Sequence, residues 1–242
     1  MRPRAFTLLE LLVSVGVIAT LVALIMPTLA ETRLAARRAG SLSNLRSHST
    51  VFASYHNDWD GMFPYITDPT ATETIIRPPG REPVRLEYFD AHRFWSVVLA
   101  DMYYEGQYLH DTFESPASRW RAATSHYFYP CAMICRPEYW NTASRVDGRS
   151  QWRPTRIHEC DHPAYKALLV EDVRLELAAL DRLPPPTTPV RMAFVDGSAG
   201  SVELSEVKEG YHLGDGRHDQ GGHLHDYPPA LHTIDGIRGR DR

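Results

Sequence analysis

Apolar residues dominate one continuous stretch near the start of the chain. Eighteen of the 25 residues from Phe6 to Ala30 are hydrophobic, and no charged residue occurs from Leu11 to Leu29. As a helix, residues 8–30 would measure roughly 35 Å, which exceeds the ~30 Å hydrocarbon core of a bilayer. A soluble helix of this length would need a polar face, and a signal peptide has an apolar core of only about 7–15 residues. The pattern therefore predicts a membrane-spanning helix over residues 6–30.

The helical pattern continues beyond this stretch but becomes one-sided. Apolar residues recur at three- and four-residue steps among arginines, which predicts an amphipathic extension of the helix, with a closing turn, over residues 31–64. Asp60-Gly61 is typical of a helix end, and Pro64 prevents the helix from resuming. Pro27 is expected to kink the helix, because proline removes one backbone hydrogen bond and crowds the preceding turn.

The pattern farther along predicts an α+β domain with a small antiparallel β-sheet over residues 65–209. Residues 67–87 are rich in helix and strand breakers and are predicted to form a loop, whereas residues 94–104 are predicted to form a helix with an aromatic face. Strands are predicted at 125–129 and 166–171, and Asp196-Gly197 is expected to turn a β-hairpin. Residues 210–242 are rich in Gly, His and Asp without apolar periodicity, which predicts a flexible tail.

Composition and charge exclude several classes of protein. With 43% hydrophobic and 23% charged residues over 242 positions, the chain is neither of low complexity nor a polytopic membrane protein. It is long enough to bury a core without disulfides. The net charge of -4 argues against nucleic acid as a partner. Glu171 and other acids near strand ends are expected to be exposed and to need no function.

The residues around the start of the apolar stretch carry a family resemblance. Residues 1–5 form a short basic leader that ends in a small residue, Ala5, and Phe6-Thr7-Leu8-Leu9-Glu10 then opens the long apolar helix. This arrangement resembles the N-terminus of type IV prepilins and type II secretion pseudopilins, in which the small residue is usually Gly. The resemblance implies cleavage between Ala5 and Phe6 by a prepilin peptidase, followed by N-methylation of the Phe6 amine. It also places Pro27 where the family often has a helix-kinking proline.

Glu10 has a specific role under this resemblance. A carboxylate among packed apolar helices needs a cation, because its burial is otherwise strongly unfavourable. The N-terminal amine of Phe6 in a neighbouring subunit can supply that cation. The alternative is that Glu10 lies at the level of the lipid headgroups.

Two further segments are similar to prepilin-like proteins. One is a run that follows the membrane helix in many bacterial members: Ser43-Asn44-Leu45-Arg46, Tyr55, Asp58, Asp60-Gly61 and Pro64. The other is the Phe-x-Asp-Gly hairpin at residues 194–197. The resemblance covers roughly residues 5–64 and 166–207, and it implies a pilin-like fold in which the long helix packs on the sheet domain.

Three cysteines and a nearby histidine offer candidate metal ligands. Cys131 and Cys135 are four positions apart, and Cys160 and His162 form a second group. Nitrogen and sulfur donors of this kind suit zinc, although the spacing matches no standard finger or ribbon. The sequence leaves three interpretations open: a disulfide, buried unpaired thiols, or a metal site.

These patterns predict a structural protein rather than an enzyme. The chain has no P-loop, no dinucleotide-binding glycine fingerprint, no nucleophile elbow and no H-E-x-x-H motif. We expect a pseudopilin or minor pilin that assembles into a filament for type II secretion or type IV pilus function. The expected partners are prepilin peptidase, other pilin-like subunits, the assembly machinery and membrane lipid, without a cofactor or nucleic acid.

The leader predicts insertion in the bacterial inner membrane with a cytoplasmic N-terminus and a periplasmic domain. Charge counting favours the opposite orientation, because the arginines after the span outnumber those before it, although long translocated domains weaken that rule. Two alternatives remain. One is a monomeric membrane-anchored extracytoplasmic binding protein, and the other is a membrane-tethered metalloenzyme that uses the Cys and His residues.

Overall fold

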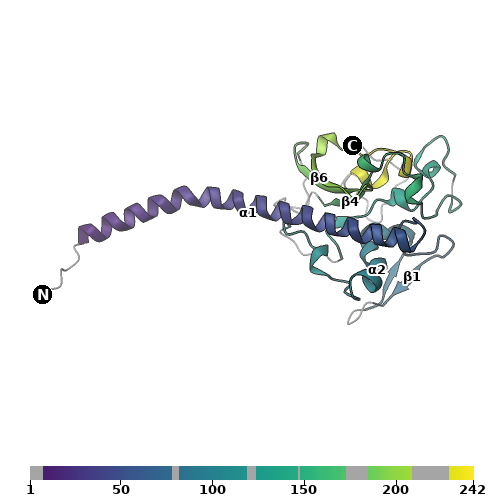
Figure 1. Ribbon diagram of the computed structural model, residues 1–242, viewed down its shortest axis with the longest axis horizontal. Helices are drawn as coiled ribbons and strands as arrows, with labels where there is room; N and C mark the ends of the chain where they lie inside the picture. Colours follow the sequence, from purple (N-terminus) through teal and green to yellow (C-terminus); the bar gives the residue numbers. More distant parts are fainter. Residues whose placement is uncertain (1–7, 78–81, 119–123, 147, 173–184, 209–228) are drawn as a thin grey trace. The chain divides into compact units, whose positions relative to one another are not determined.

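The computed structural model describes residues 8–77, 82–118, 124–146, 148–172, 185–208 and 229–242. The chain divides into two compact units, Met1–Ala39 and Gly40–Arg242, and the boundary falls within the long helix α1 (Leu8–Asp58). The second unit contains the end of α1, helix α2 (Ala91–Tyr103) and two antiparallel sheets (Figure 1). The α+β layout expected from the sequence is therefore confirmed.

The C-terminal part of α1 buries one face in the second unit. The buried residues follow helical spacing, and Leu45 and Phe52 of the predicted apolar stripe are among them, whereas Ala35, Ala39 and Ala53 are exposed. The full buried set is Ser41, Leu45, His48, Ser49, Phe52, Tyr55 and His56. The helix ends where Asp60 and Gly61 adopt φ angles of 51° and 72°. In this turn the Gly61 N–H donates to the His56 carbonyl at 2.7 Å. Left-handed backbone of this kind favours glycine, so the predicted helix end is confirmed.

The larger sheet contains four strands in the order β3 (Tyr127–Phe128), β4 (Ala167–Glu171), β5 (Pro189–Phe194) and β6 (Ala199–Glu203). β4 is buried along its whole length because apolar side chains pack on both of its faces. Leu169 joins one hydrophobic cluster and Val170 joins another. The predicted strands and the β5–β6 hairpin are confirmed, and Gly197 in its turn has a φ of 86°.

An aromatic core joins α1 and α2 to this sheet. The rings of Phe52 and Trp95 lie 5.5 Å apart between centroids. The Trp95 indole N–H donates to the Tyr127 carbonyl at 2.8 Å, and all three side chains are fully buried. Full burial of a large apolar side chain contributes roughly 1.5–3 kcal/mol. This core therefore supplies much of the free energy that holds the end of α1 in the second unit.

One segment predicted as a loop contains a hairpin. Within residues 67–87, strand β1 (Thr74–Ile76) pairs with β2 (Val84–Leu86), and Thr74 lies opposite Leu86. The loop prediction is wrong here because β-branched residues on both sides outweigh the breakers around them. Residues 78–81, which connect the strands, lie outside the described residues.

The end of the predicted tail packs into the second unit. Ala230 and Ile237 have no exposed surface, and Asp241 is 1% exposed. The Asp241 carboxylate lies 3.2 Å from the Lys166 ammonium, which also donates to the Gly236 carbonyl at 2.8 Å. The tail prediction is therefore wrong for residues 229–242, whose short 3-10 turns and polar contacts leave no periodic signal in the sequence. Residues 210–228 lie outside the described residues.

Candidate membrane and assembly segment

The first part of α1 exposes large apolar side chains on all sides. Three successive residues, Leu11, Leu12 and Val13, are each more than half exposed, and successive helical positions point about 100° apart. Fourteen exposed large hydrophobic residues lie between Leu8 and Leu29. Among the described residues, α1 is the one helix long and apolar enough to cross a membrane. Its length and exposed apolar surface are those of a helix that could span a membrane.

The free energy of insertion favours the membrane. Thirteen of the exposed residues from Leu8 to Leu29 are Leu, Ile or Val. At roughly 0.3–0.6 kcal/mol each, they favour insertion by roughly 4–8 kcal/mol. A single acid costs about 2.5–3.5 kcal/mol at the centre of a span and less near an end. Since Glu10 lies in the first turn of α1, the apolar contribution outweighs its cost.

The hydroxyl groups within the segment bond to the helix itself. The Ser14 hydroxyl donates to the Glu10 carbonyl at 2.7 Å, and the Thr20 hydroxyl donates to the Gly16 carbonyl at 2.9 Å. These bonds to the carbonyl four residues earlier satisfy the hydroxyl protons without any partner from outside the helix. In a lipid environment an unsatisfied polar group is strongly unfavourable, so this arrangement suits the hydrocarbon region.

Of the four predicted processing and assembly residues, the structure describes two. Ala5 and Phe6 lie outside the described residues. Glu10 is exposed on α1, and no other acid occurs from Leu8 to Ala30. Pro27 lies inside α1, which continues as one unbroken helix through it (Figure 1). The helix tolerates the missing N–H because the bonds of the neighbouring turns remain.

A buried polar network holds α1 at the start of the second unit. The Ser41 hydroxyl donates to the Glu171 carboxylate at 2.9 Å and lies 3.1 Å from the Tyr127 hydroxyl. Ser115 and Arg191 also donate to the Glu171 carboxylate. Glu171 is 1% exposed, so the prediction that it would be an exposed strand-end acid is wrong. Burial also raises the pKa of the Tyr127 hydroxyl to about 12, which keeps this group a hydrogen-bond donor at neutral pH.

His48 makes the second polar contact of α1 in this unit. Its Nε2 lies 2.8 Å from the Thr112 carbonyl, which can only accept, so Nε2 carries the proton. Its Nδ1 lies 2.6 Å from the Tyr104 hydroxyl and accepts from it. Burial lowers the pKa of His48 to about 4, so the ring is neutral at pH 7. This role was not predictable from the sequence pattern, because a histidine within an apolar stripe has the same spacing whether or not it has buried hydrogen-bond partners.

The cysteines form neither a disulfide nor a metal cluster in the described part of the chain. Cys131, Cys135 and Cys160 are all free, and the first two are buried. No group of three or more His, Cys, Asp or Glu side chains there could hold a metal ion, His162 included. Burial raises the pKa of the Cys131 thiol to about 12 and that of Cys135 well above its usual value, so both groups are thiols at neutral pH. Cys131 and Cys135 are thus unpaired buried thiols in the structure, whereas Cys160 is unpaired and only partly buried.

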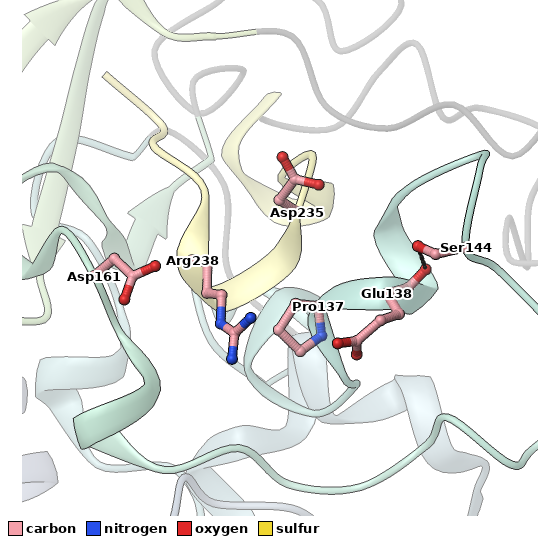
Figure 2. Close-up of a pocket in the computed structure, with 6 residues that line it drawn as sticks. All are labelled: Pro137, Glu138, Ser144, Asp161, Asp235 and Arg238. Atoms are coloured by element: carbon pink, nitrogen blue, oxygen red, sulfur yellow. Dashed lines mark hydrogen bonds between the residues drawn. The ribbon is translucent and has the colours of Figure 1, made fainter.

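A surface pocket lies beside the C-terminal segment, residues 229–242. Its volume is about 340 Å³, and it is lined by Pro137, Glu138, Ser144, Asp161, Asp235 and Arg238. Figure 2 shows Arg238 extending between Asp161 and Glu138. The four charged side chains are exposed to solvent. The Ser144 hydroxyl donates to the Glu138 backbone carbonyl at 3.1 Å rather than to a side-chain base, so the lining shows no nucleophile paired with a base.

Comparison with known proteins gives no family assignment. The chain matches no family model, no curated protein and no solved structure.

Proposed function

We propose that this chain is a pilin-like structural subunit, a pseudopilin or minor pilin, that is anchored in the bacterial inner membrane and assembled into a filament. The observation that carries the proposal is the exposed apolar part of α1 with an acid in its first turn. A simple membrane anchor has no need for a carboxylate at that position. A helix that packs against copies of itself can use the carboxylate to fix the stagger between neighbours.

The proposed mechanism is processing followed by assembly. The leader of residues 1–5 is removed between Ala5 and Phe6 by a prepilin peptidase, and the new amine is methylated. The α1 helices of several subunits then pack side by side, and Glu10 of one subunit pairs with the Phe6 amine of its neighbour. The N-terminus faces the cytoplasm, and the α+β domain faces the periplasm.

The way α1 enters the second unit supports this mechanism. The same helix that exposes apolar residues in the first unit buries Leu45 and Phe52 completely in the second. It also bonds there through Ser41 and His48. No break in helical structure separates the two parts. In a structural subunit, a helix shared by both units links the domain covalently to the part that packs in the filament.

The test begins with the mass of the mature N-terminus. The protein is purified from the membranes of cells that contain a prepilin peptidase. We expect a chain that begins at N-methylated Phe6. A chain that still begins at Met1, or one cut after about residue 30, contradicts the proposal.

Assembly is tested separately with variants of Glu10. Glu10→Ala is expected to abolish filament assembly, measured by cross-linking of neighbouring subunits, while the chain stays in the membrane fraction. Glu31→Ala removes an exposed acid from the same helix outside the apolar stretch and serves as the matched control. Normal assembly of Glu10→Ala would leave a monomeric anchored binding protein as the better description.

A further inference from the structure

Two arginines follow the apolar part of α1 directly. We propose that Arg33 and Arg37 form a binding surface for the headgroups of anionic phospholipids at the membrane boundary. This inference rests on the membrane insertion in the proposed function, but not on leader cleavage or filament assembly. The inference applies whichever side of the membrane the second unit occupies, because it depends only on the distance of the arginines from the apolar stretch.

The position of the two residues along the helix matches the headgroup layer. Leu29 is the last of the exposed apolar residues in the stretch, and Arg33 and Arg37 follow it by four and eight positions. At about 1.5 Å per residue, they lie about 6 and 12 Å farther along the helix axis. The headgroup region adds about 5–8 Å to each side of the hydrocarbon core. Because arginine side chains are long and flexible, both guanidinium groups can reach this layer.

Their position around the helix concentrates positive charge on one side. Arg33 and Arg37 are four residues apart, so they lie on the same face, and both are exposed. Neither makes an ion pair among the described residues. Glu31 is the only acid from Leu11 to Asn57, and two helical positions place it about 200° around the axis from Arg33. The acid therefore cannot neutralise the arginine face.

The side chains of this arginine face suit a phosphate group that lies next to lipid hydrocarbon. A guanidinium group donates two parallel hydrogen bonds to phosphate oxygens, and it keeps its charge in proteins. Leu34, between the arginines, is 36% exposed, and an apolar residue beside cations is typical of a helix at a membrane interface. Each basic residue near an anionic membrane surface strengthens the attraction about fivefold. Two such residues predict a preference of more than tenfold for anionic over zwitterionic lipid.

Lipid binding to the full chain in nonionic detergent tests the proposal. Native mass spectrometry measures the binding of phosphatidylglycerol and of phosphatidylcholine with the same acyl chains. We expect the wild-type chain to prefer phosphatidylglycerol by more than tenfold. Arg33→Gln/Arg37→Gln should reduce the preference to about twofold or less, and Arg33→Lys/Arg37→Lys should retain most of it.

A control variant removes two positive charges from exposed arginines far along the chain from the apolar stretch. Arg136→Gln/Arg242→Gln changes two exposed arginines of the second unit and should keep the preference of the wild type. The proposal is overturned by an unchanged preference in Arg33→Gln/Arg37→Gln or by an equal loss in the control. Displacement of the lipid by millimolar inorganic phosphate also overturns it, because it would indicate a simple anion site.

Two outcomes separate this inference from the proposed function. If Arg33→Gln/Arg37→Gln weakens cross-linking between copies but leaves the lipid preference intact, the arginines contact a second subunit and the lipid proposal is wrong. If the chain begins at Met1 but still prefers phosphatidylglycerol through these arginines, the lipid surface stands and the pilin-like function fails. Extraction of the chain from membranes by alkaline carbonate would overturn both.

Discussion

Asp241 and Lys166 form a buried ion pair that attaches the C-terminal segment to β4. Their side chains are 1% and 0% exposed. Burial raises the pKa of the Asp241 carboxyl group and lowers that of the Lys166 amine, so the interior disfavours each charge and the pair depends on mutual attraction. We consider the variant Asp241→Ala, which removes the carboxylate and leaves the ammonium group in a site without solvent.

The structure allows the size of this effect to be worked out. Removing one partner of a buried pair costs about 3–5 kcal/mol. The Asp241 carboxylate also accepts the Ala167 N–H at 2.8 Å and the Thr233 hydroxyl, and these lost bonds add about 1 kcal/mol or more. We expect Asp241→Ala to lower the free energy of unfolding by about 4–6 kcal/mol. This is a large share of the roughly 5–15 kcal/mol that stabilises a typical domain.

Urea unfolding of the full chain in nonionic detergent, followed by tryptophan fluorescence, measures this change. Trp140 reports on the segment directly, because its ring stacks on His232 at 5.2 Å between centroids. Asp161→Ala removes an exposed acid and should change stability by less than about 0.5 kcal/mol. In Lys166→Met/Asp241→Leu both charges are absent, and at least half of the lost stability should return. If Asp241→Ala unfolds within 1 kcal/mol of the wild type, the reasoning about the buried pair is refuted.

Three further predictions concern the second unit. Lowering the pH from 7 to 5 should reduce the free energy of unfolding of the second unit by about 2 kcal/mol through His48 alone. The pKa of His48 is about 4 in the folded chain and near 6.5 in the unfolded chain, so the unfolded state takes up the proton first as the pH falls. Urea midpoints that stay constant over this range would contradict the prediction. Iodoacetamide treatment of the folded protein should leave Cys131 and Cys135 unmodified. The same treatment in urea should alkylate both thiols, which mass spectrometry detects as the added mass. Gly197→Ala should lower the free energy of unfolding by about 1–2 kcal/mol, because the backbone φ of 86° is unfavourable for a residue with a side chain. No atom of the described residues lies close enough to crowd the added methyl group, so backbone strain alone causes the loss. An unchanged melting temperature would contradict this prediction.

Local patterns allowed several elements to be predicted. The end of α1 was predictable because Asp60-Gly61 interrupts a long helical period at a point where the backbone turns left-handed. The β5–β6 hairpin was predictable because two short strand-forming runs flank a turn that needs glycine. In both cases the deciding interactions lie within a few residues along the chain.

The buried charges were not predictable, because their partners are distant in sequence. Glu171 bonds to Ser41, 130 residues earlier, and to Ser115, 56 residues earlier. An acid at the end of a strand looks exposed until these partners are placed around it. Lys166 offered a faint signal, since it is one of only two lysines among 26 basic residues. The exposed apolar part of α1 was predictable in location from its composition, but its proposed function depends on neighbouring subunits and lipid.

The contacts of α1 in the second unit also determine how this part of the helix responds to mechanical load. Ser41 and His48 hold polar bonds on the same buried face as Leu45 and Phe52. Residues 41–52 span about 17 Å of helix. A pulling force along the helix axis therefore loads these contacts together, in shear, rather than breaking them one after another. We expect the second unit to resist extraction of α1 cooperatively and to yield in a single rupture event.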